Sequence, residues 1–382
     1  MKRTALCAAF VPAIVPFSVS HAASVTVYAK ADLGLVYSHV DAGSGEAVDN
    51  LSMQSGNFLA SRFGFKGEED ISAQTKVGFV LENGFEVDSG SMKTNGTIFD
   101  RGSWLYVRNQ DYGEVAAGKI GILRSSAADY SYFVLGARVS PFGSGWNAAG
   151  SPSYMMPFYG VIRDNTLAYV SPSMNGLKIH VQYSMGTNEY ENKPSTDRYY
   201  GVAATYDHDR FQLVALLDTL NENSSNKDDV DDSWGITLGG NATFDFGKVY
   251  AWAQYFKDAN SIWGLLGLDN YKLFDGLDEI SGYSINAAFN KPIGKANLML
   301  SIGYMDAEPD DNMTYLQRRS QVGDKLERYT ASLGYLYHFS QTLKFYAAAS
   351  YYKDKIDMTT ADGTRFDNPS TFHVMSGLCL SF

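Results

Sequence analysis

Residues 61–70 read SRFGFKGEED, and basic and aromatic side chains alternate along this stretch. Successive side chains of an extended strand point to opposite faces, so Arg62 and Lys66 share one face while Phe63 and Phe65 share the other. Such a strand separates an aqueous side from an apolar side. The rest of the chain decides what these two sides are.

The first residues of the chain have the features of an export signal. The sequence MKRTALCAAFVPAIVPFSVSHAA combines a basic start, an apolar middle, and small residues at Ser20 and Ala22. This pattern predicts a signal peptide over residues 1–22, cleaved after Ala22. The apolar part is too short for a membrane-spanning helix and contains two prolines, and a buried N-terminal helix is the alternative. Residues 23–382 then form one predicted domain.

Composition excludes several classes of protein. Without the leader Cys379 is the only cysteine, which excludes a disulfide within the chain. The leader also removes Lys2 and Arg3, which leaves 29 basic against 42 acidic residues and a net charge of −13. This charge makes nucleic acid a poor partner. No stretch of 18 consecutive apolar residues follows, which excludes a helical membrane protein.

The remaining chain alternates at period two for about ten residues at a time and then breaks at Gly, Asn or Asp clusters. It is also rich in Gly (36), Tyr (26) and Phe (22). We expect about sixteen strands. They lie near residues 23–40, 61–70, 75–85, 98–109, 112–122, 160–171, 176–186, 198–208, 210–221, 233–245, 247–258, 279–290, 294–306, 326–339, 341–354 and 371–382.

Short and long connections between these strands roughly alternate. Short joins such as Asp209-Arg210 contrast with long polar ones such as NENSSNKDDVDD. This pattern predicts an all-β transmembrane antiparallel barrel with short periplasmic turns and long external loops. A soluble β-sandwich or β-helix is the alternative, but a sheet this large rarely stays open. Aromatics near strand ends, such as Tyr199-Tyr200 and Tyr351-Tyr352, suit the two membrane interfaces.

The chain ends TFHVMSGLCLSF, another alternating strand, with Phe382 as its last residue. Cys379 falls on the face opposite Phe382, beside His373, and is expected to be a small wall residue rather than a reactive thiol. A C-terminal aromatic on such a strand resembles the assembly signal of bacterial outer-membrane barrels. Recognition by the barrel-assembly machinery through Phe382 is therefore expected.

The chain resembles the general porins of the Gram-negative outer membrane. The resemblance rests on SVTVYAKADLG, SRFGFKGEEDI, GFVLENGFEVDSG, FDRGSWLYV, YGEVAAGKIG, RDNTLAYVSP and the terminal Phe, which together extend over nearly the whole mature chain. It implies a homotrimer of sixteen-stranded barrels in the outer membrane, in contact with lipid and lipopolysaccharide. It also implies a third external loop that folds into the lumen and narrows it.

In the family, a ladder of basic residues forms one wall of the constriction, and the matching positions are Lys30, Arg62, Arg101 and Arg163. Lys119 is expected to extend this row. Alternation independently places the first three opposite the apolar residues of their strands, and an arginine facing lipid at mid-membrane would cost roughly 2–4 kcal/mol. The alternative is that these cations pair with carboxylates such as Glu82 and brace the wall. Both can hold at once.

The infolded loop is expected over residues 123–159, and here the sequence departs from the family. Many relatives carry an acidic residue between the proline and phenylalanine of this loop, whereas Pro141 is followed directly by Phe142. Asp129 is the only carboxylate in the loop, which also contributes Arg124 and Arg138. A ring of fixed cations in a narrow aqueous lumen screens solutes by charge. The sequence therefore predicts passive diffusion of ions and small hydrophilic solutes with a bias toward anions.

Other functions have weaker support. We find no metal-binding HExxH motif and no G-x-S-x-G elbow, so no catalytic residue, metal or cofactor is expected, and an enzyme is disfavoured. A substrate-specific channel for sugars or dicarboxylates is the alternative function, because loop aromatics such as Tyr132, Trp146 and Tyr154 could stack on sugars. Packing of these aromatics against the wall is the favoured interpretation. A plugged structural or adhesive barrel is a third class.

Overall fold

The structure is a computed structural model that describes most of the predicted mature chain. The described residues are 24–43, 45–125, 131–143, 145–146, 149–150, 152–157, 162–186, 197–221, 232–259, 280–309, 321–322, 325–355, 357–359 and 365–382. The predicted signal peptide and Asp129 lie outside them. Within them, no helix has the length and apolar character needed to cross a membrane.

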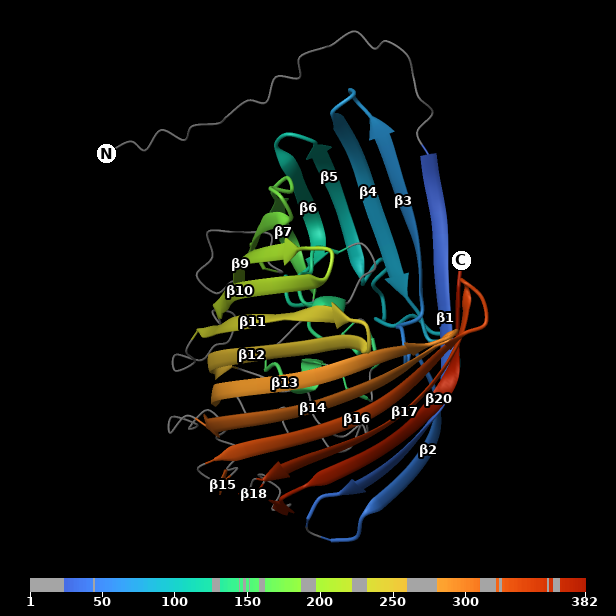
Figure 1. Ribbon diagram of the computed structural model, residues 1–382, viewed down its shortest axis with the longest axis vertical. Coiled ribbons are helices and arrows are strands. Elements are labelled where there is room, and N and C mark those ends of the chain that lie inside the picture. The colour runs from blue at the N-terminus through green and yellow to red at the C-terminus, as the bar shows by residue number, and fades with distance from the viewer. Residues whose placement is uncertain are drawn as a thin grey trace, which may run out of the picture.

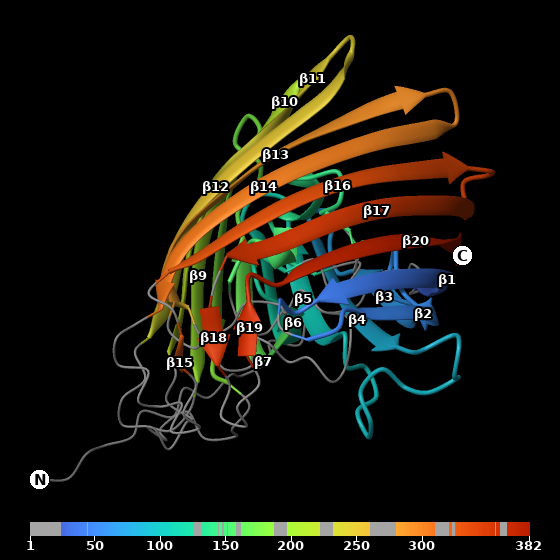
Figure 2. The ribbon, with the colours of Figure 1, turned by 90° about the horizontal axis from the view of Figure 1, so that it is seen from below.

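Seventeen strands form one antiparallel sheet that closes on itself, with β1 pairing with β20 (Figures 1 and 2). The strands are β1 (Ser24–Asp41), β2 (Val48–Ser55), β3 (Arg62–Asp70), β4 (Thr75–Gly84), β5 (Gly102–Asn109), β6 (Gly113–Gly121), β7 (Ile162–Val170), β8 (Leu177–Ser184), β9 (Arg198–Asp207), β10 (Phe211–Asn221), β11 (Ser233–Phe244), β12 (Gly247–Ala259), β13 (Ile280–Ile293), β14 (Ala296–Pro309), β16 (Leu326–His338), β17 (Leu343–Lys355) and β20 (Ser370–Ser381). The short strands β15 (Gln321–Val322), β18 (Asp357–Thr359) and β19 (Arg365–Asp367) form a separate sheet.

The barrel has sixteen strand positions, because β2 and β3 share one of them. The later part of β1 pairs with β2, and its first part pairs with β3. The predicted closed barrel of sixteen strands is therefore confirmed, whereas the break in its second strand was not predicted. The eight residues of β2 alternate, with Leu51 and Met53 exposed and Asn50, Ser52 and Gln54 partly buried. The predicted strand over 98–109 begins later, at Gly102, because Phe99 has a φ of 58°.

Side chains alternate between the two faces of the sheet as predicted. On β14, Leu298, Leu300 and Ile302 point outward and are exposed, while Met299 and Ser301 point inward and are buried. Outward exposure of large apolar side chains recurs on nearly every strand of the barrel. Such a surface is suited to lipid rather than to water.

The connection between β6 and β7 supplies much of the interior packing. Figure 1 shows part of it inside the ring of strands, where it contains two single-turn 3-10 helices, Gly136–Arg138 and Pro152–Tyr154. Its described residues pack against inward side chains of the wall. The cluster joins Leu123, Val134, Leu135, Val139, Tyr154, Met155 and Met156 of the loop to wall residues that include Trp252, Phe256, Met305 and Tyr352.

The outward face gives a first testable prediction. Leu300 lies near the middle of β14, whereas Ile293 lies at the short turn after β13. Leu300→Arg is expected to lower the free energy of unfolding by roughly 2–4 kcal/mol, and Ile293→Arg by about 0–1 kcal/mol, because the cost of a charge falls toward the interface. Urea titration of the barrel in lipid bilayers measures both. Equal losses at the two positions would contradict a membrane centred on β14.

Candidate pore constriction

Arg62 and Arg101 meet at a single carboxylate on the inner wall. Glu82 of β4 is fully buried. Its Oε1 lies 2.9 Å from Nε of Arg101 and 3.6 Å from a terminal nitrogen of Arg62. Its Oε2 accepts a hydrogen bond of 2.9 Å from the hydroxyl of Tyr28. Two cations around one anion leave this cluster with one unit of positive charge.

The stretch of residues 61–70 positions Arg62 beside this carboxylate. Arg62 is paired in register with Lys30 of β1 and with Gly84 of β4, so three inward positions meet across neighbouring strands. Gly64 is the next inward residue of β3. A Cβ atom there would lie 2.4 Å from the Tyr28 ring, so only glycine leaves that ring room to reach Glu82. Alternation in sequence placed Arg62 and Lys30 on one face, in agreement with this register, whereas Arg101 precedes β5 and lies here through its contact with Glu82. The part of these residues in the constriction stays a prediction.

Lys119 and Arg163 lie where the alternation breaks. The pairing of β6 with β7 shifts register between Gly118 and Ile120, and Asn165 of β7 has a φ of 48°. A bulge of this kind reorients the side chains beside it, so alternation cannot assign a face to either cation. The Lys119 ammonium lies 2.5 Å from Oδ1 of Asp164. Lys119 is thus placed in an ion pair, and Arg163 lies opposite Ile120 in the register.

Arg124 and Arg138 hold the loop to the wall. Arg124 is paired with the fully buried carboxylate of Asp218, which also accepts a hydrogen bond from Tyr199. Arg138 makes two contacts of 3.0 and 3.1 Å with Asp207 and donates to the carbonyl of Val134. These contacts brace the loop against the wall, a role that the sequence did not predict for these two arginines. A part for either arginine in selectivity stays a prediction, as does that of Asp129.

Sequence reasoning missed a further anchor at the end of the loop. Arg328 and Asp354, both fully buried, form two hydrogen bonds of 2.8 and 2.9 Å. Arg328 also donates to the carbonyl of Tyr154 at 2.8 Å, and the hydroxyl of Tyr352 accepts from the amide of Gly150 at 3.0 Å. The available signal was an arginine and an aspartate at inward positions of adjacent strands.

The loop aromatics pack rather than line an open surface. Tyr132, Trp146 and Tyr154 are all buried. Tyr132 packs edge-on against Trp104 of β5 at 6.1 Å and donates to the carboxylate of Glu114. Burial, with the nearby Glu114 charge as a second cause, raises the pKa of Tyr132 well above its usual value, so this hydroxyl stays a donor. These contacts favour the packing interpretation over a sugar-stacking surface.

Signs of a metal or thiol site are missing from the part of the chain that the structure describes. Within it, no group of three or more His, Cys, Asp and Glu residues could hold a metal ion. Cys379 is buried on the inner face of β20, opposite Asp32 of β1 and Lys344 of β17 in the register. The cations at the inner wall are thus the candidate functional groups.

Comparison with known proteins relates this geometry to one family. A family model described as Gram-negative porin matches residues 4–357. An outer membrane porin of Bordetella pertussis is 24% identical over 95% of this chain and 97% of its own length. A protein of a Halomonas species named monosaccharide porin is 26% identical over 81% of each chain. Among solved structures, an anion-selective porin from Comamonas acidovorans superposes with a TM-score of 0.67 at 19% identity, covering 94% of this chain and all of that one.

The family match extends over most of the chain, and the fold agrees with it. The inner face carries charged groups and the outer face carries apolar ones, as a channel through a membrane requires. The protein belongs to the Gram-negative porin family and forms a channel in the outer membrane for passive diffusion of ions and small solutes.

Proposed function

We propose that this channel favours small anions over cations. The observation that carries the proposal is the cluster of Arg62, Arg101 and Glu82, whose net positive charge lies beside Lys30 in the register. A fixed positive charge in a narrow aqueous lumen attracts anions and repels cations. The described residues of the infolded loop carry no carboxylate that would oppose this field.

The acidic total of the chain does not decide the sign of the bias. Many carboxylates occur in polar stretches such as KDDVDD and EPDDN, which the sequence predicts to be external connections. Charges separated from the constriction by more than about 8–10 Å of salt water are largely screened. The name of the Comamonas porin, anion-selective, agrees with the proposal.

Measurement of the zero-current potential in a salt gradient tests the proposal. The purified protein is inserted into a planar bilayer with potassium chloride at different concentrations on the two sides. A potential with the sign expected for chloride permeation supports the proposal. The opposite sign would show that cations pass more readily and would contradict it, while leaving the channel function intact.

A sugar-specific channel is the second candidate, and the name of the Halomonas relative favours it. Burial of Trp146 and Tyr154 weighs against it, because stacking on sugars needs exposed rings. Titration of a monosaccharide against the chloride current separates the two functions. Saturable block at low sugar concentration would favour a specific site, whereas no block supports general diffusion. A dicarboxylate is tested in the same way.

We also propose that the mature protein is a homotrimer that contacts lipopolysaccharide and is assembled through its last residue. The side chain of Phe382 is exposed, while its backbone pairs with Ala29 by hydrogen bonds of 2.9 and 3.2 Å. Deletion of Phe382 is expected to reduce the amount of folded protein in the outer membrane, measured as the band that changes its mobility in gel electrophoresis when the sample is heated.

The predicted cleavage of the signal peptide after Ala22 is tested by the mass of the mature chain. We expect the protein to turn over no substrate.

A further inference from the structure

The break between β2 and β3 leaves a gap beside β1. On this side the pairing with β3 ends at Lys30, and the pairing with β2 starts at Leu33. Ala31 and Asp32 therefore have no strand partner there, and residues 56–61, which we name the strand-break segment, occupy the gap. On its other side β1 pairs with β20 without interruption.

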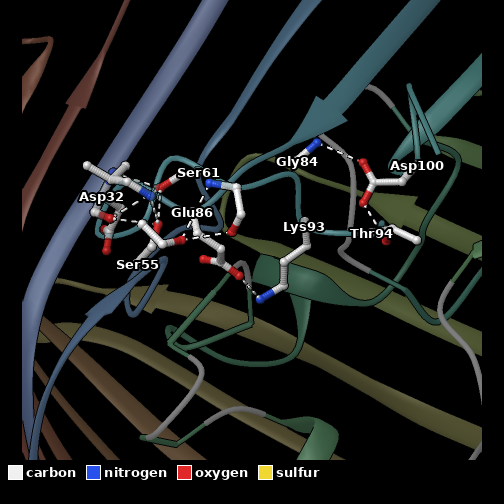
Figure 3. Close-up of polar contacts among 11 residues, drawn as sticks. Asp32, Ser55, Ser61, Gly84, Glu86, Lys93, Thr94 and Asp100 are labelled. Atoms are coloured by element: carbon white, nitrogen blue, oxygen red, sulfur yellow. Dashed lines mark hydrogen bonds and ion pairs between the residues drawn. The ribbon is translucent and has the colours of Figure 1, made fainter. Parts of the chain in front are cut away.

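Asp32 holds the strand-break segment in place. Its carboxylate is fully buried and accepts hydrogen bonds from the amides of Phe58 (3.4 Å) and Leu59 (3.2 Å) and from the hydroxyl of Tyr346 (2.9 Å). Its backbone exchanges hydrogen bonds of 3.0 and 3.1 Å with the hydroxyl of Ser61. Figure 3 shows Asp32 beside Ser55 and Ser61, and the Ser55 hydroxyl also accepts from the amide of Val87.

The strand-break segment in turn carries the infolded loop. The carbonyl of Phe58 accepts a hydrogen bond of 2.8 Å from the amide of Trp146, and the two rings pack edge-on at 4.9 Å. Trp146 is buried with a φ of 65°, a conformation that a bulky residue keeps only where its surroundings fix it. A Cβ atom at Gly145 would lie 1.8 Å from the Phe58 carbonyl, which shows how closely the backbones approach.

The same segment also orients the cation that follows it in the chain, Arg62 at the start of β3. Nε of Arg62 donates a hydrogen bond of 2.7 Å to the carbonyl of Ala60. One short segment thus fixes the guanidinium of Arg62 and the tip of the loop. Its own position depends on the buried carboxylate of Asp32.

We propose that Asp32 is a positioning residue for the constriction: it fixes the strand-break segment and, through it, both the loop at Trp146 and the guanidinium of Arg62. Asp32 does not need to touch the permeating ion. The proposal requires that the protein conducts, but it does not depend on which ion is preferred. Without the carboxylate, the loop tip leaves the wall more often, and the constriction fluctuates.

Single-channel recording of Asp32→Asn tests the proposal. Loss of a buried hydrogen-bond acceptor is expected to make the released loop tip about 5- to 30-fold more populated. This appears as increased open-channel noise and closure at lower voltage. The control is Asp41→Asn on the same strand, whose exposed carboxylate accepts from the amide of Gly43. It is expected to match the wild type.

Tyr346→Phe tests the positioning role of Asp32 without removing its charge. It removes one hydrogen-bond donor to Asp32 and leaves the carboxylate in place. It is expected to increase the noise to a smaller extent, and it carries the test alone if Asp32→Asn does not fold. Trp146→Ala combined with either variant is expected to add nothing, because the two changes break the same connection. Wild-type noise in Tyr346→Phe and in any folded Asp32→Asn would overturn the proposal. Failure of the wild type itself to conduct would instead overturn the channel function.

Discussion

Replacing Glu82 by glutamine is expected to increase the preference of the channel for chloride, and replacing Arg101 by glutamine is expected to decrease it. Both residues belong to one cluster with a net charge of one positive unit, so either change alters that charge by one unit in opposite directions. A glutamine at position 82 keeps one oxygen to accept from Arg101, and its amide NH2 group can donate to the Tyr28 hydroxyl, which now donates to Glu82. The change also costs stability, because the buried guanidiniums of Arg62 and Arg101 lose their carboxylate, so permeability is measured on protein shown to be folded.

The size of the effect follows from Coulomb's law. A unit charge about 8 Å from a passing ion contributes roughly 0.5 kcal/mol in water and roughly 2 kcal/mol at an effective dielectric constant of 20. Each substitution is thus expected to change the permeability of chloride about 2- to 30-fold and that of potassium by a similar factor in the opposite direction, so their ratio changes by about 5- to 900-fold. The zero-current potential in a salt gradient measures this ratio for each variant.

Lys355→Gln is the matched control, because it removes one positive charge from the outer face of β17. Its permeability ratio should stay at the wild-type value. If Glu82→Gln and Arg101→Gln moved the ratio in the same direction, or no further than Lys355→Gln, the cluster would not set selectivity. Its role would then be to brace the wall.

The sequence predicted the features of this protein that follow from alternation alone. Phe63 and Phe65 lie opposite Arg62 because side chains of a strand alternate, and no tertiary contact is needed to see it. The same rule predicted the inward position of Lys30. Its repetition along the chain predicted a closed barrel of sixteen strand positions. The strands of a membrane barrel and their two faces can be predicted well from sequence, since one face must be apolar along every strand.

Features that depend on distant contacts could not be predicted. Arg124 pairs with Asp218, 94 residues away, and this contact exists only because the loop returns to the wall. The strand break at residues 56–61 depends on Asp32, which reads as an ordinary polar residue of an alternating strand. At Lys119 the alternation itself fails, because the bulge beside it changes the direction of neighbouring side chains.

Two buried charge clusters among the described residues differ in net charge. Arg62 and Arg101 leave a net charge around Glu82, whereas Arg328 and Asp354 neutralise one another where both are fully buried. The first group can act on a passing ion. The second group is expected to act on stability, because removal of one partner leaves an uncompensated buried charge.

Asp354→Ala is accordingly expected to lower the free energy of unfolding by about 3–5 kcal/mol, because it leaves the buried guanidinium of Arg328 without its carboxylate. It should also weaken the hold of Arg328 on the carbonyl of Tyr154 and so loosen the end of the infolded loop. Urea titration in lipid bilayers measures the loss. The double variant Arg328→Met with Asp354→Ala should recover much of it, since neither buried charge of this pair then remains.

The control is Glu327→Ala, which breaks a partly exposed ion pair with Lys355 on the neighbouring strand. Its unfolding midpoint should stay near that of the wild type. A midpoint for Asp354→Ala as close to the wild type as that of Glu327→Ala would mean that water reaches Arg328 once the carboxylate is gone, and that this end of the loop is held by its apolar contacts.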